Sequence, residues 1–184
     1  MNTSMTTVLI ETLRQAQRFG FFGERPIEDA VEHSMDFVRP IATLAAGARV
    51  VDLGSGGGLP GLVIAEQLPH TSVLLIDRRE KRADFLQQAV SRLGWSHVTV
   101  RCGDVGSLMR EVTQGHEQRF DLVTARGFGP PDVTLRCAAS LRAPTGQIVI
   151  SEPPTGDRWA PDLLIELNVR RQQHASVAVF SSAG

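Results

Sequence analysis

The feature that most constrains the fold is a regular alternation of short β-rich runs with amphipathic helical segments from Arg49 onward. Such alternation is typical of parallel strands joined by helical crossovers. We therefore predict an α/β fold, a Rossmann-like doubly wound sheet that is mostly parallel. The predicted strands cover residues 49–53, 72–77, 97–102, 120–124 and 147–151, and the clearest helices cover residues 80–93 and 131–141.

The two ends of the chain depart from this alternation. Residues 6–19 and 26–45 have helical spacing and are separated by Gly20, Gly23 and Pro26, which indicates an N-terminal helical cap. Residues 163–169 and 176–180 form two β-like runs with a short polar turn between them, which predicts a terminal antiparallel hairpin at the sheet edge. We expect one compact domain, with residues 1–47 as the cap and residues 48–184 as the core.

A glycine-rich stretch, VVDLGSGGGLPG at residues 50–61, follows the first predicted strand. The carboxyl ends of strands are where open α/β sheets bind ligands. Gly56 and Gly58 lack side chains, so the backbone there can turn sharply and approach a ligand. Pro60 suits the first turn of a following helix. The stretch is therefore predicted to be a ligand-binding loop that leads into a helix.

Two templates fit this loop. Gly56, Gly58 and Gly61 satisfy the GxGxxG pattern of dinucleotide-binding folds, and Asp77 lies about 20 residues further on, as that fold requires. The same stretch, with Asp52 before alternate glycines, resembles motif I of class I S-adenosylmethionine-dependent methyltransferases. In that superfamily Asp77 would accept the two ribose hydroxyls, and Asp104, after the third strand, would lie where adenine is contacted.

The resemblance extends to one family. The segments GGGLPG, DRREKRADFL and FDLVTARGF resemble the small-subunit ribosomal RNA guanine 7-methyltransferase family, also called glucose-inhibited division protein B. The likeness covers residues 49–150. It includes Lys81, the one lysine of the chain, and Arg126 after the fourth strand. The resemblance implies an enzyme that uses S-adenosyl-L-methionine to methylate a guanine ring nitrogen of small-subunit ribosomal RNA.

The resemblance also implies site residues. Arg126 is the expected catalytic residue, because its planar guanidinium could hold a substrate phosphate, a guanine edge or the cofactor carboxylate. The substrate contacts are expected at Lys81, Arg82 and His33, where His33 and Asp36 match the spacing of the family's His-x-x-Asp-Ser. The expected cofactor contacts are Asp52, Gly54, Ser55, Gly56, Gly58, Asp77, Arg78, Asp104, Val105 and Arg126.

Departures from the family pattern keep other functions open. Glu152 stands where the family has a lysine after the fifth strand, and a carboxylate exposed there would repel RNA phosphate. The alternatives are a small-molecule methyltransferase of specialised metabolism, with Trp95 or Trp159 near an apolar pocket, and a catalytically silent cofactor-binding protein. A nicotinamide-dependent oxidoreductase is a further alternative.

Composition limits the other classes of function. The net charge of -1 gives no global attraction to nucleic acid or to an anionic membrane, so RNA contacts would come from a local patch, of which Arg78 to Arg82 is the densest. Cys102 and Cys137 form no CxxC pair and are expected to be buried reduced thiols. No zinc signature, Ser-His-Asp set or paired-carboxylate motif is visible, so we expect no metal. We expect a cytoplasmic monomer or homodimer without a membrane partner.

Overall fold

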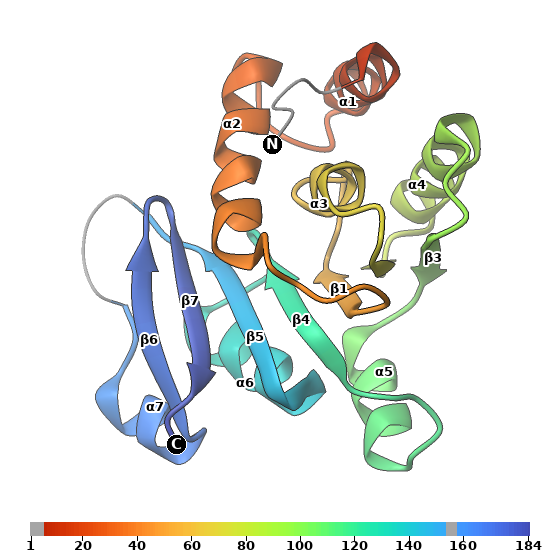
Figure 1. Ribbon diagram of the computed structural model, residues 1–184. Helices are drawn as coiled ribbons and strands as arrows, with labels where there is room; N and C mark the ends of the chain where they lie inside the picture. Colours follow the sequence, from red (N-terminus) through yellow and green to blue (C-terminus); the bar gives the residue numbers. More distant parts are fainter. Residues whose placement is uncertain (1–5, 154–157) are drawn as a thin grey trace.

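A computed structural model describes residues 6–153 and 158–184 and contains a seven-stranded sheet with helices on both faces (Figure 1). The strand order is β3-β2-β1-β4-β5-β7-β6. Neighbouring strands from β3 to β5 pair in parallel, and β7 pairs antiparallel with both β5 and β6. The predicted doubly wound sheet with a terminal antiparallel hairpin is therefore confirmed. The strands are β1 (Arg49–Leu53), β2 (Ser72–Asp77), β3 (Val98–Cys102), β4 (Phe120–Ala125), β5 (Arg142–Ser151), β6 (Val169–His174) and β7 (Val177–Ser182).

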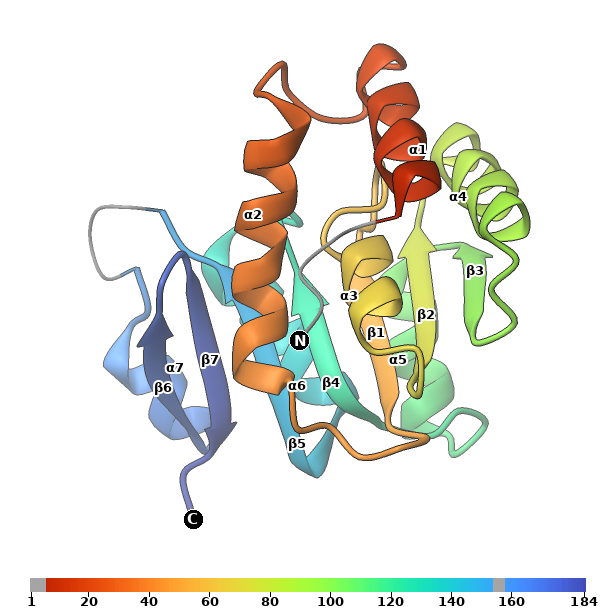
Figure 2. The same cartoon turned by 45° about the horizontal axis from the view of Figure 1, so that its top comes forward.

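The helices divide between the two faces of the sheet, as Figures 1 and 2 show. Each face has its own cluster of buried apolar side chains, with α1 to α4 contributing to one and α5 to α7 to the other. Helices therefore pack on both faces of the sheet. The helices are α1 (Thr7–Arg18), α2 (Ile27–Val38), α3 (Gly61–Gln67), α4 (Glu80–Leu93), α5 (Val105–Thr113), α6 (Pro131–Leu141) and α7 (Pro161–Glu166).

The two N-terminal helices pack on the sheet face that also carries α3 and α4. Leu9 and Leu13 of α1 and Phe37 of α2 are fully buried in the same apolar cluster as strand residues of β1 and β2. The second helix is shorter than predicted. It ends at Val38 and is followed by a 3-10 turn (Arg39–Ile41), because Pro40 has no N–H with which to continue the helix.

The C-terminal region corrects one sequence prediction. The strand predicted over residues 163–169 is wrong, because residues 161–166 form α7, which begins with Pro161 at its first turn and carries Asp162 there. The first strand of the hairpin is instead β6, whose sequence VRRQQH is polar because it lies at the exposed edge of the sheet. The hairpin itself is present, with Val169 paired to Ser182 and His174 to Val177.

The parallel register brings the carboxyl ends of β1, β2 and β4 to one edge of the sheet, since Leu53 pairs with both Ile76 and Ala125. The predicted site residues that follow these strands therefore share that edge. Both cysteines are free, but Cys102 at the end of β3 is exposed, so its predicted burial is wrong. In the described part of the chain, no helix combines the length and apolarity needed to cross a membrane.

Candidate functional site

The glycine-rich loop leaves β1 through left-handed backbone positions. Gly54 has a φ of 67° and Gly56 a φ of 58°, conformations that L side chains disfavour. The Ser55 N–H donates to the Ile76 carbonyl at 3.0 Å, and the Ser55 hydroxyl donates to the Asp52 carbonyl at 2.8 Å. These bonds tie the loop to β1 and β2 at the carboxyl edge.

Asp77, the last residue of β2, fixes the loop from the neighbouring strand. One carboxylate oxygen, Oδ2, accepts the Gly56 N–H at 2.9 Å, and the other, Oδ1, accepts the Arg79 N–H at 2.9 Å. The side chain is almost fully buried. Because each oxygen of a carboxylate has two lone pairs, both keep capacity for one more donor.

A hollow of about 300 Å³ opens beside this carboxylate. Asp104 caps the N-terminus of α5 by accepting the Gly106 N–H at 3.0 Å, and Val105 is the first residue of that helix, so the Val105 N–H has no partner within the helix. The hollow therefore combines carboxylate acceptors with a backbone N–H donor that has no partner within its own helix. Its wall includes five predicted cofactor residues, namely Gly54, Asp77, Arg78, Asp104 and Val105.

A second hollow, of about 190 Å³, adjoins the first, since Gly54, Arg82 and Gly127 line both. Arg126 lines this second hollow and is half-buried. It forms no ion pair with any residue in the described ranges 6–153 and 158–184. Burial lowers the pKa of Arg126, the carboxylate of Asp52 opposes that change, and the charge of Arg25 adds to it. A half-buried arginine without a carboxylate partner is suited to an anionic or carbonyl group of a ligand.

Three phenylalanines at these hollows were not predicted from the sequence. Phe21 and Phe22, from the α1–α2 connection, line the second hollow, and Phe128, after β4, lines the first. A Cβ on Gly57 would lie 2.5 Å from the Phe22 ring, and one on Gly54 would lie 3.0 Å from the Phe128 ring. The aromatic rings therefore pack directly on the glycine loop. Phe128 belongs to the segment FDLVTARGF, but no motif marks Phe21 or Phe22, because their contacts with the loop join segments far apart in the chain.

The basic cluster at the start of α4 divides into two parts. Arg82 lies between the hollows, with its guanidinium 3.8 Å from an Asp77 oxygen and its Cζ 5.8 Å from the centre of the Phe21 ring. Arg78, Arg79 and Lys81 are exposed. Arg82 therefore lies between the hollows, Arg78 and Arg79 form the exposed rim of the first, and Lys81 lines neither.

Gly58 and His33 have surroundings that the sequence did not reveal. A Cβ on Gly58 would lie 2.3 Å from Leu62 Cδ1, so this glycine faces α3 and not a hollow. His33 lies on α2, where its Nδ1 is 3.0 Å from the Ser176 hydroxyl at the β6–β7 turn.

Glu152 requires a correction. Its side chain is 3% exposed, and it accepts hydrogen bonds from Arg158 Nε at 3.1 Å and from Trp159 Nε1 at 2.5 Å. Arg171 Nη2 lies 3.6 Å from Glu152 Oε2. The repulsion of RNA phosphate expected of an exposed Glu152 therefore does not apply, because this carboxylate is buried and faces two guanidinium groups.

Asp52 is fully buried below the loop. Its Oδ1 accepts a hydrogen bond from the Thr124 hydroxyl at 2.8 Å. Its Oδ2 has no hydrogen-bond partner within the described part of the chain. A Cβ on Gly61 would lie 2.7 Å from Oδ2, which shows how closely the start of α3 approaches. Burial raises the pKa of Asp52 to about 6, against lowering contributions from Thr124, Ser55, Gly61 and Arg126.

This raised pKa predicts a pH-dependent effect of Asp52→Asn. The folded protein holds the Asp52 proton more tightly than the unfolded chain, so ionised Asp52 costs stability as the pH rises from 3.8 through about 6. Asparagine cannot ionise. The free energy of unfolding of the variant, relative to the parent, should therefore rise by about 2–3 kcal/mol from about pH 4 to about pH 8. Urea denaturation across this pH range measures the change, and Asp162→Asn, at an exposed aspartate, is the control. If the difference in unfolding free energy between Asp52→Asn and the parent did not vary with pH, the raised pKa of Asp52 would be contradicted.

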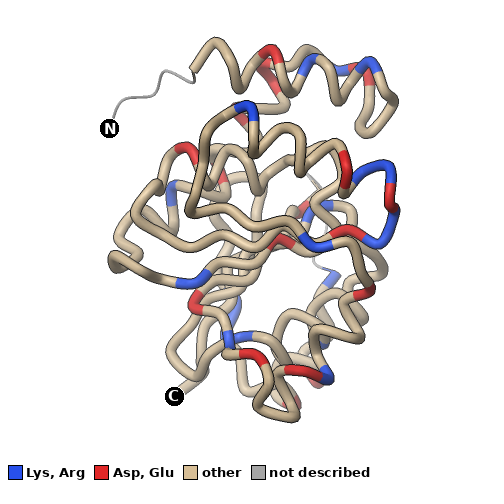
Figure 3. Tube along the Cα trace, turned by 90° about the vertical axis from the view of Figure 1, so that its right-hand side faces the viewer, with Lys and Arg blue, Asp and Glu red and all other residues tan. Residues whose placement is uncertain are grey.

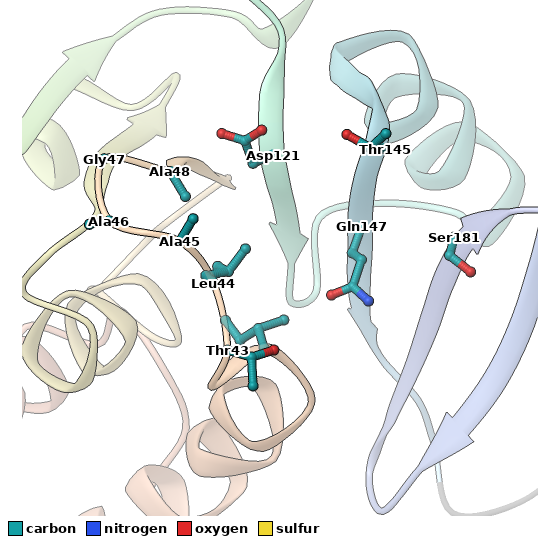
Figure 4. A pocket seen from close by; sticks show the side chains of 11 residues that line it. Thr43, Leu44, Ala45, Ala46, Gly47, Ala48, Asp121, Thr145, Gln147 and Ser181 are labelled. Carbon is teal, nitrogen blue, oxygen red and sulfur yellow. The ribbon is translucent and has the colours of Figure 1, made fainter.

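A further hollow lies at the opposite edge of the sheet, near the amino ends of the strands. Figure 4 shows this hollow between the connection over residues 43–48 and the strand residues Asp121, Gln147 and Ser181. Its volume is about 480 Å³, larger than either hollow at the glycine loop. None of the predicted site residues lines it, so size alone does not identify the functional site.

Comparison with known proteins identifies the family. A family model described as rRNA small subunit methyltransferase G, GidB, matches residues 2–153. The chain belongs to the GidB family.

Two relatives called ribosomal RNA small subunit methyltransferase G show the level of similarity. The protein from Chromobacterium violaceum is 35% identical over 117 residues, which cover 64% of this chain and 53% of the relative. The protein from Rubrobacter xylanophilus is 37% identical over 130 residues, which cover 68% of this chain and 49% of the relative. This GidB chain spans about half the length of the curated relatives it matches.

Solved structures agree on the fold of this GidB chain. A variant of MtNAS in complex with S-adenosylmethionine superposes with a TM-score of 0.62 at 15% identity, covering 94% of this chain and 73% of that one. Coclaurine N-methyltransferase, bound to N-methylheliamine and SAH, gives a TM-score of 0.58 at 16% identity, covering 83% and 52%. At these identities the likeness establishes the Rossmann-like architecture alone.

Proposed function

We propose that this GidB chain binds S-adenosyl-L-methionine in the two adjoining hollows and transfers its methyl group to a guanine ring nitrogen of small-subunit ribosomal RNA. The family membership supports the reaction and the class of acceptor. The observation that carries the proposal is the position of Asp77, whose carboxylate joins the glycine loop to the larger hollow while both its oxygens keep a lone pair.

The residues present fit the cofactor. The lone pairs of Asp77 suit the two ribose hydroxyls, which are paired donors in fixed geometry. Asp104 and the N–H of Val105 offer an acceptor and a donor to adenine at the start of α5. Gly56 leaves open the space where a side chain would project, since a Cβ there would meet nothing closer than 3.6 Å. The methionine end would then lie along Gly54 to Gly56, toward Arg126.

The chain's own residues act in this reaction by positioning. S-adenosyl-L-methionine supplies an activated methyl group on a sulfonium, and a guanine ring nitrogen supplies its own lone pair, so no general base is needed. Arg126 and Arg82 hold the ligands at the second hollow, and Phe21 and Phe22 cover the glycine loop and exclude water. Alignment of the two reactants supplies the rate enhancement.

RNA contact is assigned to the rim. Arg78 and Arg79 line the larger hollow and are exposed, and Lys81 is exposed nearby in the sequence at the start of α4, so all three can neutralise backbone phosphates. In the view of Figure 3, acidic and basic positions are interspersed along the described part of the chain. Binding is therefore expected to depend on this local rim.

Small-molecule methylation has less support. Trp159 is buried against Glu152 and Phe180, and Trp95 packs against the apolar cluster beside α4. Neither lines the hollows at the glycine loop. The second hollow is lined by two arginines as well as by aromatic rings, which favours an anionic acceptor over an apolar one.

The cofactor assignment predicts that Asp77→Ala weakens S-adenosylhomocysteine binding by about 10- to 150-fold, the scale of lost hydrogen bonds to a charged group. Isothermal titration calorimetry measures this. Asp84→Ala, an exposed aspartate of α4 outside both hollows, is the matched control and should bind as the parent does. A parent protein that prefers NAD to S-adenosylhomocysteine would contradict the proposal.

The acceptor is tested with labelled S-adenosyl-L-methionine. The methyl group should enter unmethylated small ribosomal subunits or their RNA, at a guanine identified by mass spectrometry. Cofactor binding without transfer to particles or naked RNA would remove RNA as the acceptor. Small acceptors would then be screened, and failure of all of them would favour a catalytically silent binding protein.

A further inference from the structure

An aromatic cluster joins the end of α1 to α4, which lies beside it in Figure 2. The ring centroids of Phe19 and Phe21 are 5.7 Å apart, and those of Phe21 and Phe85 are 5.5 Å apart. The Phe19 and Phe85 rings are perpendicular, with centroids 6.0 Å apart. Phe21 also lines the second hollow, where Arg82 Cζ lies 5.8 Å from the centre of its ring. One ring therefore separates Phe19 from the wall of the candidate site.

Phe19 is the exposed member of this cluster. Phe85 is buried and Phe21 is partly buried, whereas Phe19 is 56% exposed. A single exposed apolar side chain is ordinary on a protein surface. Phe19 differs because it continues a packed cluster that reaches a ligand-sized hollow. Its exposed area is therefore suited to contact with the part of a ligand that extends beyond the hollow.

The backbone on both sides of Phe19 is fixed by a Schellman motif at the end of α1. The Phe21 N–H donates to the Ala16 carbonyl at 3.1 Å. The Gly20 N–H donates to the Gln17 carbonyl at 2.9 Å, and Gly20 has the left-handed φ, 70°, that this motif requires. The Gln17 side-chain amide then donates to two carbonyls of the α1–α2 connection, at 2.8 and 2.7 Å. A hydrogen-bonded turn thus presents the ring.

Cations accompany the exposed ring. Arg18 directly precedes it, is exposed and forms no ion pair within the described residues 6–153 and 158–184. Lys81 is exposed and lies four residues before Phe85, so the two share one face of α4. The acidic residues nearby in α4, Glu80 and Asp84, lie about 100° or more from Phe85 around the helix axis. The surface around the aromatic cluster therefore favours a polyanion over an apolar partner.

The proposed reaction creates a need for such a surface. A base that is modified on a ring atom has to leave its stack or belong to a single strand. Its neighbours in the RNA then have an uncovered face, and proteins that bind single-stranded RNA cover such faces with aromatic rings. Each neighbouring base also brings a phosphate, which attracts a lysine or an arginine. An exposed ring with cations beside it, one ring away from the hollow, meets both requirements.

We propose that Phe19 stacks on an unpaired base next to the acceptor guanine, with Arg18 and Lys81 at the adjoining phosphates. The inference rests on the proposed function and extends its RNA interface from Arg78 and Arg79 to the end of α1. Every base has a π-face, so this contact strengthens RNA binding without selecting a sequence.

Binding of fluorescently labelled, unmethylated small-subunit RNA tests the contact without an activity assay. Phe19→Ala should weaken binding by about 5- to 150-fold, the effect of one lost base–aromatic stack. Phe19→Trp should keep the affinity, whereas Phe19→Leu, which is apolar but has no aromatic face, should lose most of it. Ile165→Ala removes another exposed apolar side chain, on α7, and is the control that should bind as the parent does. Equal RNA affinities of Phe19→Leu and the parent would overturn the stacking.

A cycle with abasic RNA identifies the stacked base. Single abasic nucleotides are placed in turn on either side of the guanine that the parent methylates. At one position the missing base should weaken binding to the parent as much as Phe19→Ala does, and should weaken binding to Phe19→Ala no further. Independent losses at every flanking position would show that Phe19 contacts no base there and would overturn the proposal.

The affinity for S-adenosylhomocysteine separates stacking from a structural role. Phe19 lines neither hollow, so Phe19→Ala should bind this ligand as the parent does. If the two affinities fell together, the ring would only support Phe21, and the proposal would be overturned. It would also be overturned if Phe19→Ala dissociated a dimer of the parent in sedimentation without changing RNA affinity, because the surface would then join two copies of the chain.

The remaining outcomes distinguish this inference from the proposed function. If the parent methylates RNA and Phe19→Ala binds that RNA equally well, the stacking is overturned alone. If the parent binds S-adenosylhomocysteine but neither binds nor methylates RNA, the proposed acceptor fails and the stacking fails with it.

Discussion

Glu152→Lys should lower the free energy of unfolding by about 3–5 kcal/mol, the cost of breaking a buried ion pair by removing one partner. In the parent protein the Glu152 carboxylate accepts from Arg158 Nε and Trp159 Nε1 and faces Arg171. A lysine at this position would place a third positive charge against two guanidinium groups in a site where the side chain is 3% exposed. Equilibrium urea denaturation, followed by circular dichroism, measures the loss.

An exposed glutamate supplies the control for this charge reversal. Glu166 pairs with Arg136 at the surface, where both side chains are about half exposed, so Glu166→Lys should cost no more than about 1 kcal/mol. Glu152→Gln, which keeps the shape but removes the charge, should fall between the two. If Glu152→Lys instead kept its stability and bound RNA more tightly, Glu152 would have to face phosphate, and the buried arrangement would be contradicted.

The core of the fold could be predicted because its signals are local. The apolar runs of β1, β2 and β4 are short, bounded and separated by amphipathic helices, so period and length identify them without tertiary information. The end of the chain was harder. β6 lies at an exposed edge and has the polar sequence VRRQQH, while the apolar residues before it belong to a short helix whose buried side chain is Leu163. Apolar periodicity therefore pointed to the wrong segment.

The site shows the same division between local and distant signals. Asp52, Asp77 and Asp104 were found because each follows or ends a strand, and the parallel register brings strand ends together. The environment of Glu152 was not predictable, because its burial depends on Trp159 and on an arginine of β6. Ser176 contacts His33 across 143 positions, and no short motif records such a pairing. Sequence reasoning thus located Asp77 and Asp104, which line the first hollow, but not the contacts between distant segments.

The last prediction separates ligand approach from backbone strain at Gly56. Gly56→Val should reduce S-adenosylhomocysteine affinity by at least about 100-fold, since the added side chain would project beside Arg82 into a hollow of about 190 Å³. Its φ of 58° also imposes a stability cost of about 1–2 kcal/mol on any L side chain. Calorimetry and urea denaturation on the same sample measure the two effects.

Two other glycines turn this into a matched comparison. Gly94 ends α4 with a φ of 69° and has open space around a Cβ, so Gly94→Val should show the same strain with unchanged affinity. Gly58→Val should mainly unfold the protein, because its Cβ would lie 2.3 Å from Leu62 Cδ1 and 3.4 Å from Leu86, both buried. If Gly56→Val and Gly94→Val bound S-adenosylhomocysteine equally well, the loop would serve only as a turn. Loss of affinity in Gly56→Val alone would instead require that the ligand occupy the space that this glycine leaves open.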